Sequence, residues 1–193
     1  MDARPDTRAL DGARQDIVRS RTARRAIGVA VFATATALGA RVAVPVPGTP
    51  IPLTLQLICV ILAGAVLGAR LGAASQALYL GVGMLGAPIF AAGGGLPYLL
   101  GPTGGYLIAF PIAAYVVGSI VGRSRSIAVL TAALVGGVLT VHAGGAAWLA
   151  ISTGDVRLAL EYGVGPFLLM DVVKIALALL IALRVRPRAL ELF

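Results

Sequence analysis

An acid and a base, Asp171 and Lys174, stand three residues apart in an otherwise apolar stretch near the C-terminal end of the chain. Residues at positions i and i+3 share one face of a helix, so both side chains are expected to point the same way. A charged side chain at the centre of a membrane helix costs about 2.5–3.5 kcal/mol on insertion scales and is rare unless it lines a site. An ionised Asp171 can accept N–H donors, and Lys174 can donate to a carbonyl or a carboxylate.

The alternative for this pair is a mutually neutralising ion pair that only locks the last helix into the bundle. Buried ion pairs seldom add net stability over apolar side chains. A purely structural role is therefore a costly choice inside a membrane, and ligand binding is favoured.

Composition places these residues in an integral membrane protein. The 193-residue chain is 59% hydrophobic and 12% charged, whereas soluble domains carry roughly 25% charged residues. The apolar runs have the roughly 17–25 residues that span a bilayer and do not alternate like barrel strands. We predict an all-α integral membrane protein, a six-transmembrane-helix bundle, with a polar turn around Asp155 before the last span. The spans are expected at about 26–44, 53–67, 71–85, 103–121, 127–151 and 162–183.

Arginines at the ends of the spans set the orientation. Residues 1–24 form a basic segment with too few large apolar residues to pack, and we predict a disordered cytoplasmic tail there. A membrane domain at 25–185 and a short cytoplasmic tail at 186–193 follow. Because cytoplasmic loops retain an excess of Lys and Arg, both termini are predicted on the cytoplasmic side of the cell inner membrane. Only Arg41 and Arg157 then lie toward the outside.

Several function classes are disfavoured. The net charge of +8 does not indicate nucleic-acid binding, because the arginines stand at span ends and in the tail rather than on a folded soluble face. Cys59 is the only cysteine, so there is no internal disulfide and no CxxC motif. His142 is interpreted as a hydrogen-bonded bundle residue, since no second metal ligand stands at a useful spacing. Without a nucleophile–base pair or a Walker-type motif, we expect no enzyme, no ATP hydrolysis, no cofactor and no metal.

Two irregular stretches, 45–52 and 86–102, lie at the predicted outer face. Four prolines between 45 and 52 exclude a helix there, and the second stretch is glycine-rich yet apolar. Irregular backbone cannot face lipid, although it can cap or line a cavity. Both stretches are therefore expected to close a solute site over the outer half of the bundle. A simple stiff turn is the alternative for the first stretch.

The first span contains small residues at helical spacing. Ala33 and Ala37 stand four apart on one face, which lets another helix approach closely. Spacing alone favours packing within the bundle, and contact with a partner protein is the alternative.

Four stretches carry a resemblance to a known family. They are PGTPIPLTLQ at 47–56, LAGAVLGARLG at 62–72, LGPTGGY at 100–106, and GPF at 165–167 followed by Asp171-x-x-Lys174. In this order they resemble the BioY family, the biotin-specific substrate-binding subunits (S components) of energy-coupling-factor (ECF) transporters. The resemblance covers about residues 24–184.

The resemblance implies a subunit that binds biotin near the outer leaflet and joins a transmembrane coupling protein and two ABC-type ATPases for uptake. It implies that Ala33 and Ala37 contact the coupling protein and that Asp171 and Lys174 bind biotin. Further substrate-binding candidates are Gln56, Thr49, Gly93, Gly94, Tyr98, Thr103 and Tyr106. Association into a homo-oligomer is left open.

A self-sufficient proton-coupled secondary transporter of biotin or a similar small carboxylate is the alternative, with Asp171 as the titrating group. Such transporters commonly show chains of acids or histidines and inverted repeats. The sequence has no clear 3+3 repeat, and His142 is the only other candidate titrating group in the spans. These observations favour a subunit that depends on partner proteins for energy.

Overall fold

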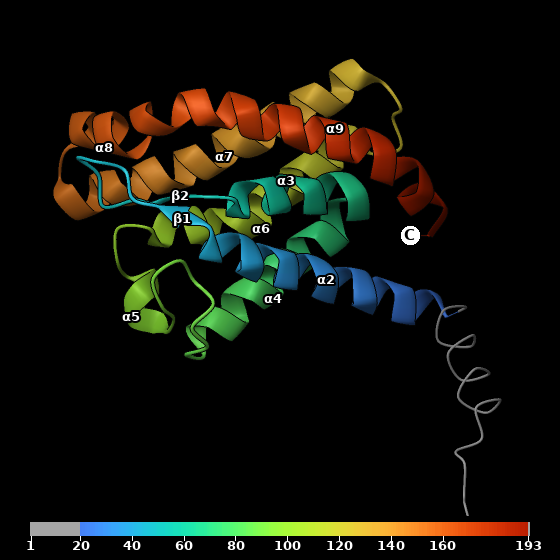
Figure 1. Ribbon diagram of the computed structural model, residues 1–193, viewed down its shortest axis with the longest axis horizontal. Coiled ribbons are helices and arrows are strands. Elements are labelled where there is room, and N and C mark those ends of the chain that lie inside the picture. Colours follow the sequence, from blue (N-terminus) through green and yellow to red (C-terminus); the bar gives the residue numbers. More distant parts are fainter. Residues whose placement is uncertain (1–19, 193) are drawn as a thin grey trace, which may run out of the picture.

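The computed structural model describes residues 20–192, most of which are helical (Figure 1). The long helices are α2 (Arg21–Arg41), α3 (Gln56–Leu67), α4 (Ala69–Met84), α6 (Gly104–Val121), α7 (Ile127–Thr153) and α9 (Leu168–Leu192). The short elements are β1 (Ala43–Val44), β2 (Leu53–Thr54), α5 (Leu96–Leu99), α8 (Val156–Gly163) and the 3₁₀ turn η1 (Gly165–Phe167). Residues 1–19 of the predicted tail lie outside the described residues. The last four residues of that tail, 21–24, already belong to helix α2.

Among the described residues, three segments are long and apolar enough to cross a membrane. They are Gly104–Val121, Ile127–Thr153 and Val156–Leu190, whose most apolar 18-residue windows have mean hydropathies of 1.8, 1.9 and 2.3. Helix α3 is apolar but shorter. Large apolar side chains such as Leu139 and Leu180 are exposed on these helices, a surface that suits lipid rather than water. The chain is a mostly helical membrane protein.

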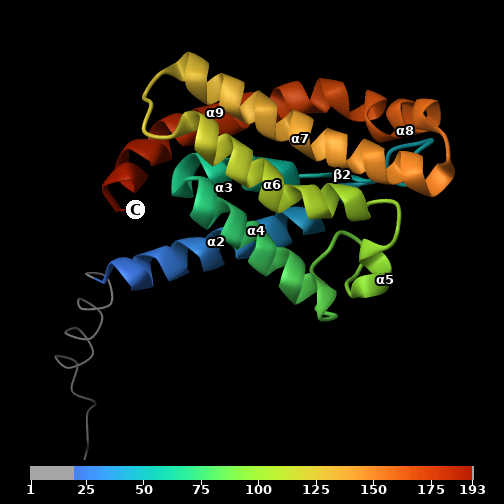
Figure 2. The same cartoon turned by 180° about the vertical axis from the view of Figure 1, so that it is seen from behind.

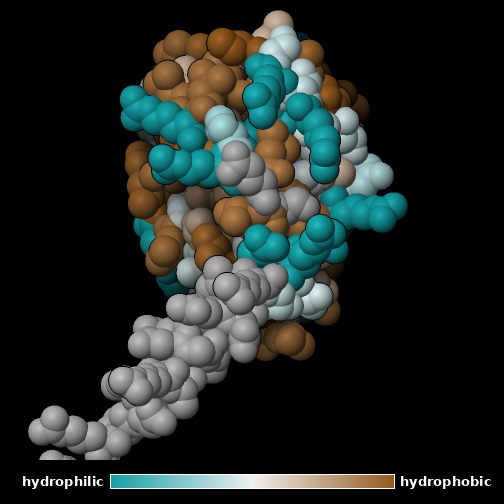
Figure 3. All heavy atoms as spheres, turned by 90° about the vertical axis from the view of Figure 1, so that its right-hand side faces the viewer, coloured by the Kyte–Doolittle hydropathy of each residue, from teal (hydrophilic) through white to brown (hydrophobic). Residues whose placement is uncertain are grey.

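Helix α6 lies at the centre of the bundle, where it packs against α3, α4 and α7 (Figure 2). Helix α2 packs against α3 and α4, and α9 packs against α3 and α7. The start of α2 and the end of α9 lie at one end of the molecule, while the β1–β2 pair, α5 and α8 lie at the other (Figure 1). Figure 3 looks onto the first of these ends, where hydrophilic side chains gather among hydrophobic ones.

The proline-rich stretch 45–52 is not helical, as its prolines predict, and two short strands flank it. Ala43 pairs with Thr54 and Val44 with Leu53 in an antiparallel ladder. These residues were expected to lie within helical spans. They are extended instead, because the backbone N–H and C=O groups beside the prolines form hydrogen bonds with each other across the ladder.

A helix replaces the polar turn that was predicted around Asp155. Gly154, with a φ of 72°, ends α7 in the left-handed conformation that glycine adopts without strain. The Asp155 carboxylate then accepts the backbone N–H groups of Arg157 and Leu158 at 2.8 and 3.1 Å, which caps the first turn of α8. The chain therefore approaches the last long helix through α8 and η1.

Helix α9 continues to Leu192, so residues 186–192, which were predicted as a tail, are helical. Arg186 is only 5% exposed and fixes this end of α9 to the rest of the bundle. Its guanidinium donates to the backbone carbonyls of Ala65, Val121, Gly122 and Ser124. These acceptors lie in α3, at the end of α6 and in the loop that follows, and they hold the guanidinium inside the protein.

Ala33 and Ala37 pack inside this chain. Ala33 is buried in the main hydrophobic cluster, and Ala37 is half-buried against the same cluster. Between them, the Thr36 hydroxyl donates to the backbone carbonyl of Phe32 and lies 3.1 Å from the side-chain oxygen of Gln76. This packing agrees with the internal-packing alternative. Contact with a partner protein stays a prediction.

Candidate functional site

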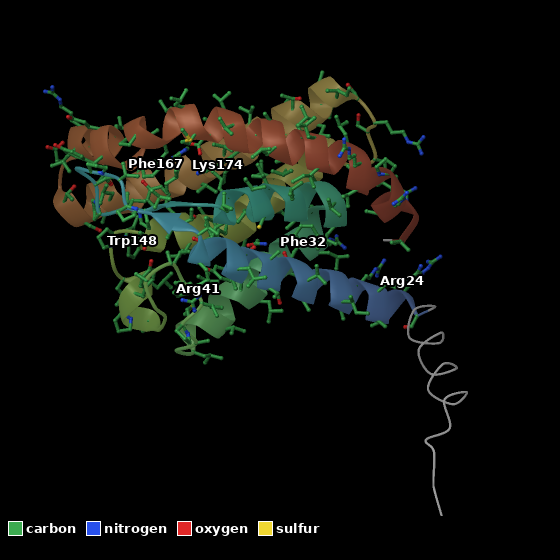
Figure 4. The ribbon with its side chains drawn as sticks, viewed as in Figure 1. Arg24, Phe32, Arg41, Trp148, Phe167 and Lys174 are labelled. Carbon is green, nitrogen blue, oxygen red and sulfur yellow. The ribbon has the colours of Figure 1, made fainter. Side chains whose placement is uncertain are left out.

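Helices α7 and α9 bring three ionisable side chains together. Asp171 Oδ1 lies 3.3 Å from Lys174 Nζ, so the two side chains face each other as their spacing predicts. Asp171 Oδ2 lies 2.5 Å from Nε2 of His142, which comes from α7. The three residues are between 3% and 7% exposed. In Figure 4, Lys174 and Phe167 lie in the half of the molecule that carries α8, far from Arg24.

The hydrogen-bonding capacity of this cluster is only partly used. An ionised carboxylate can only accept, so His142 Nε2 carries the proton in this contact. Lys174 has three N–H donors, and within residues 20–192 one of them finds an acceptor, on Asp171. His142 Nδ1 is buried without a partner in the same part of the chain. The cluster therefore retains both donors and acceptors for a bound molecule.

A cavity opens beside these three residues, between α3, α6, α7 and α9 and beneath the irregular stretches. Its aromatic lining is formed by Tyr98, Tyr106, Phe110 and Phe167. Its polar lining is formed by Thr54, Gln56, Thr103, His142, Asp171 and Lys174. Concave, mostly apolar sites with a few convergent polar groups are typical of small-molecule binding.

Gln56 is a fixed polar group on the α3 side of the cavity. Its side-chain nitrogen donates to the Tyr79 hydroxyl at 2.6 Å, and its oxygen accepts the Thr54 hydroxyl at 3.2 Å. The Tyr79 hydroxyl in turn donates to the backbone carbonyl of Ile89 at 3.3 Å. The chain of hydrogen bonds ties the stretch 86–102 to α3 and α4, and it sets the orientation of the Gln56 amide.

Tyr106 forms the wall next to His142. Its hydroxyl donates to the backbone carbonyl of Gly163 at 2.7 Å, and its ring lies edge-on to the imidazole, with centroids 6.4 Å apart. A Cβ at position 145 would lie 2.1 Å from this ring. Gly145, three residues after His142 on α7, therefore leaves the space that Tyr106 occupies.

The cavity brings together most of the predicted substrate-binding residues. Those that line it are Gln56, Tyr98, Thr103, Tyr106, Asp171 and Lys174. They come from three separate stretches of the chain, and the fold places them around one space.

Thr49, Gly93 and Gly94 do not line this cavity. Thr49 lines a neighbouring hollow between the two irregular stretches, which shares Tyr98 and Thr103 with the cavity. Gly93 pairs with Phe90 through the backbone, and a Cβ at Gly94 would lie 2.0 Å from a backbone carbonyl oxygen. The two glycines shape the loop that covers the site.

The lining residues that were not predicted from the sequence include His142, Phe110 and Phe167. His142 is hydrogen-bonded, as interpreted, but its partner is the predicted site residue Asp171. The sequence contained one indication of its role: His142 is the only histidine of the chain, and the spans contain few charged residues. The two phenylalanines give no such signal, since apolar residues fill every span.

The fold resembles that of a solved transporter subunit. The crystal structure of the S-component for biotin from an ECF-type ABC transporter superposes with a TM-score of 0.78 over 96% of this chain and 95% of that chain. The two sequences are 22% identical, so this likeness concerns the fold alone.

Relatives found by sequence comparison also align with most of this chain. A probable biotin transporter BioY of Pyrococcus horikoshii is 45% identical over 159 residues, which cover 82% of this chain and 93% of the relative. The biotin transporter BioY of Thermotoga maritima is 36% identical over 169 residues, covering 87% and 99%. Residues 12–191 match the model of the BioY family. This chain is therefore a member of the BioY family.

Proposed function

We propose that this chain is the biotin-binding S component of an ECF transporter and takes biotin up across the cytoplasmic membrane together with partner proteins. The full-length similarity to relatives described as biotin transporters supports the substrate. The fold likeness to an S-component supports the role as a substrate-binding subunit.

The observation that carries the proposal is the buried Asp171–Lys174 pair on an aromatic-lined cavity. Biotin has a ureido ring with two N–H donors and a carbonyl, an apolar thiophane ring and chain, and a terminal carboxylate. An ionised Asp171 accepts N–H groups, and Lys174 donates to a carbonyl or carboxylate, in charge-assisted bonds that are stronger than neutral ones. Aromatic side chains such as Tyr106 and Phe167 provide apolar contact surface.

In this proposal, six helices cross the membrane (α2, α3, α4, α6, α7 and α9) and both termini are cytoplasmic. The arginines of the first turns of α2 and of the last turns of α9 belong to the end seen in Figure 3, as retention of positive charge on the cytoplasmic side requires. The cavity then opens toward the outer half of the bundle, where a solute arrives.

The energy for uptake comes from a transmembrane coupling protein and two ABC-type ATPases in this proposal. Helix α2 is the proposed contact with the coupling protein, and half-buried Ala37 is the residue at which to test it. Ala37→Leu should impair partner-dependent uptake while biotin binding by the purified subunit is retained. Loss of binding in this variant would assign Ala37 to internal packing alone.

Calorimetric titration of the detergent-purified protein with biotin tests the substrate. We expect saturable one-to-one binding of biotin and no heat with lipoate, which lacks the ureido ring; desthiobiotin, which keeps that ring, reports on the contribution of the thiophane. Absence of biotin binding would refute the proposal.

Uptake of labelled biotin into vesicles that lack the partners tests the energy source. A self-sufficient proton-coupled transporter would accumulate biotin there when a proton gradient is applied, and the Asp171–His142 contact offers it proton-carrying groups. We expect no gradient-driven accumulation without the partners.

A further inference from the structure

His142 lines the cavity and carries a buried polar atom that has no hydrogen-bond partner among the described residues. This atom is Nδ1, and the side chain as a whole is 9% exposed. Buried polar atoms without partners are rare in folded proteins and call for an explanation. The other such atom in this part of the chain, Nε of Arg24, lies at the opposite end of the molecule (Figure 4).

The Asp171 carboxylate determines the protonation of the imidazole. Nε2 lies 2.5 Å from Asp171 Oδ2 and must donate to it, so a neutral His142 has a bare Nδ1 that can only accept.

The neighbouring side chains cannot supply the missing donor. The Tyr106 hydroxyl already donates to the Gly163 carbonyl at 2.7 Å. Lys174 donates to Asp171 Oδ1, and Phe167, whose ring centroid lies 6.3 Å from the imidazole, has no polar hydrogen. The rings of Tyr106 and Phe167 flank the imidazole, and the bond from Nε2 anchors it. Among the described residues the neighbours of the imidazole thus leave Nδ1 free to accept from a molecule bound in the cavity or from water there.

We propose that His142 is a specificity-determining residue of this site, whose Nδ1 accepts a ring N–H of the cyclic urea of biotin. The ligand's identity rests on the proposed function. A cyclic urea has two N–H donors and one carbonyl, and the cluster offers two acceptors, Asp171 and His142, and one donor, Lys174. A terminal carboxylate has no donor for Nδ1. The ureido head group, rather than the carboxylate end, accordingly lies at this cluster.

Nitrogen NMR tests the contact directly, because His142 is the only histidine of the chain. Protein labelled with ¹⁵N-histidine and purified through a histidine-free tag should show one imidazole. Saturating biotin should move the Nδ1 resonance from its free-imine position toward that of a hydrogen-bonded imine and leave the protonated Nε2 signal nearly unchanged. An Nδ1 signal that stays in place while calorimetry shows biotin binding would overturn the assignment of His142. Absence of binding in calorimetry would instead refute the proposed function.

Two substitutions separate the two nitrogens. The amide of His142→Gln falls near Nε2 and can still donate to Asp171, whereas the amide of His142→Asn falls near Nδ1 and can still accept from the ligand. Loss of one neutral hydrogen bond corresponds to roughly 5–10-fold in affinity. We expect His142→Gln to weaken biotin binding by about that factor, as measured by calorimetry, with unchanged thermal stability. A His142→Gln affinity within twofold of the wild type would contradict the proposal.

His142→Asn completes the comparison. The variant loses the bond to Asp171 but keeps an acceptor at the Nδ1 position, so we expect it to lose more thermal stability than His142→Gln. A binding loss that simply follows the loss of stability in both variants would reduce His142 to a structural role.

Discussion

Two buried cations on the same helix, Lys174 and Arg186, have opposite surroundings. They are 7% and 5% exposed. Arg186 donates through all three of its nitrogens to four backbone carbonyls, whereas Lys174 donates to Asp171 alone within the described residues. Burial of a charge therefore does not by itself identify a binding site. The unused hydrogen-bonding capacity beside a cavity does.

The positions of the two cations explain the difference. The carbonyls around Arg186 include those at the end of α6, where the last turn of a helix has free acceptors and attracts positive charge. Lys174 lies along a helix whose own backbone is paired, beside an open space. Arg186 completes the fold, and Lys174 leaves room for a ligand.

The largest effect is expected from Asp171→Asn, which removes the counter-charge at the site. Loss of the ionised acceptor leaves Lys174 as a buried unpaired cation, and breaking a buried pair in this way costs about 3–5 kcal/mol. The lost charge-assisted hydrogen bond to the ligand contributes about 1.5–3 kcal/mol. We therefore expect the affinity for biotin to fall by about 10–100-fold in calorimetry, since each 1.4 kcal/mol is a factor of ten.

Gln76→Ala is the matched control for Asp171→Asn. Gln76 is fully buried and hydrogen-bonded to Ser75 and Thr36, but it does not line the cavity. We expect it to lower thermal stability and to change the affinity less than threefold. Equal and small effects of the two variants on affinity would mean that the Asp171–Lys174 pair is structural.

Arg186→Met should affect stability and leave binding nearly unchanged. The substitution leaves buried carbonyls without donors, a penalty of roughly 1–3 kcal/mol for each group that water does not reach. We expect a lower melting temperature in detergent and a biotin affinity within twofold of the wild type. Arg184→Met, at an exposed position of the same helix, is the control and should leave both quantities unchanged. A large loss of affinity in a folded Arg186→Met protein would remove the distinction between the two cations.

A moderate effect on both stability and binding is expected from Gly145→Ala. The added methyl group would overlap the Tyr106 ring, and overpacking of this kind typically costs about 1–3 kcal/mol. We expect both a lower melting temperature and about fivefold weaker biotin binding, because Tyr106 borders the ligand and His142. Gly81→Ala is the control, since no atom lies within 4 Å of its added Cβ. Unchanged binding would show that Tyr106 can move without consequence for the site.

The sequence predicted the features that depend on local pattern. Long apolar runs gave the helices α6, α7 and α9, the prolines at 45–52 excluded a helix there, and the i, i+3 spacing placed Lys174 against Asp171. Arg186, near the end of an apolar run, was assigned to a tail because most arginines at such positions face water. Its burial depends on carbonyls more than 60 residues away in the chain.

The contact between His142 and Asp171 could not be predicted for the same reason. It joins α7 to α9 across 29 positions, and it depends on how closely the helices approach. Glycines such as Gly105 and Gly145, where a Cβ would overlap the neighbouring helix or its side chains, set the approach of α6 to α7 in the same way. No periodic pattern in one helix reports which residue of another helix it will face.

The short spacing of Asp171 and Lys174 has a consequence for biosynthesis. The most apolar 18-residue window of the segment Val156–Leu190 has a mean hydropathy of 2.3, the highest among the three apolar segments. Since opposite charges one helical turn apart offset each other, the segment can partition from the translocon into lipid before its neighbours have docked. His142 then contacts Asp171 only when the helices assemble later. The polar cluster is therefore completed after the segment with the charged pair has entered the lipid.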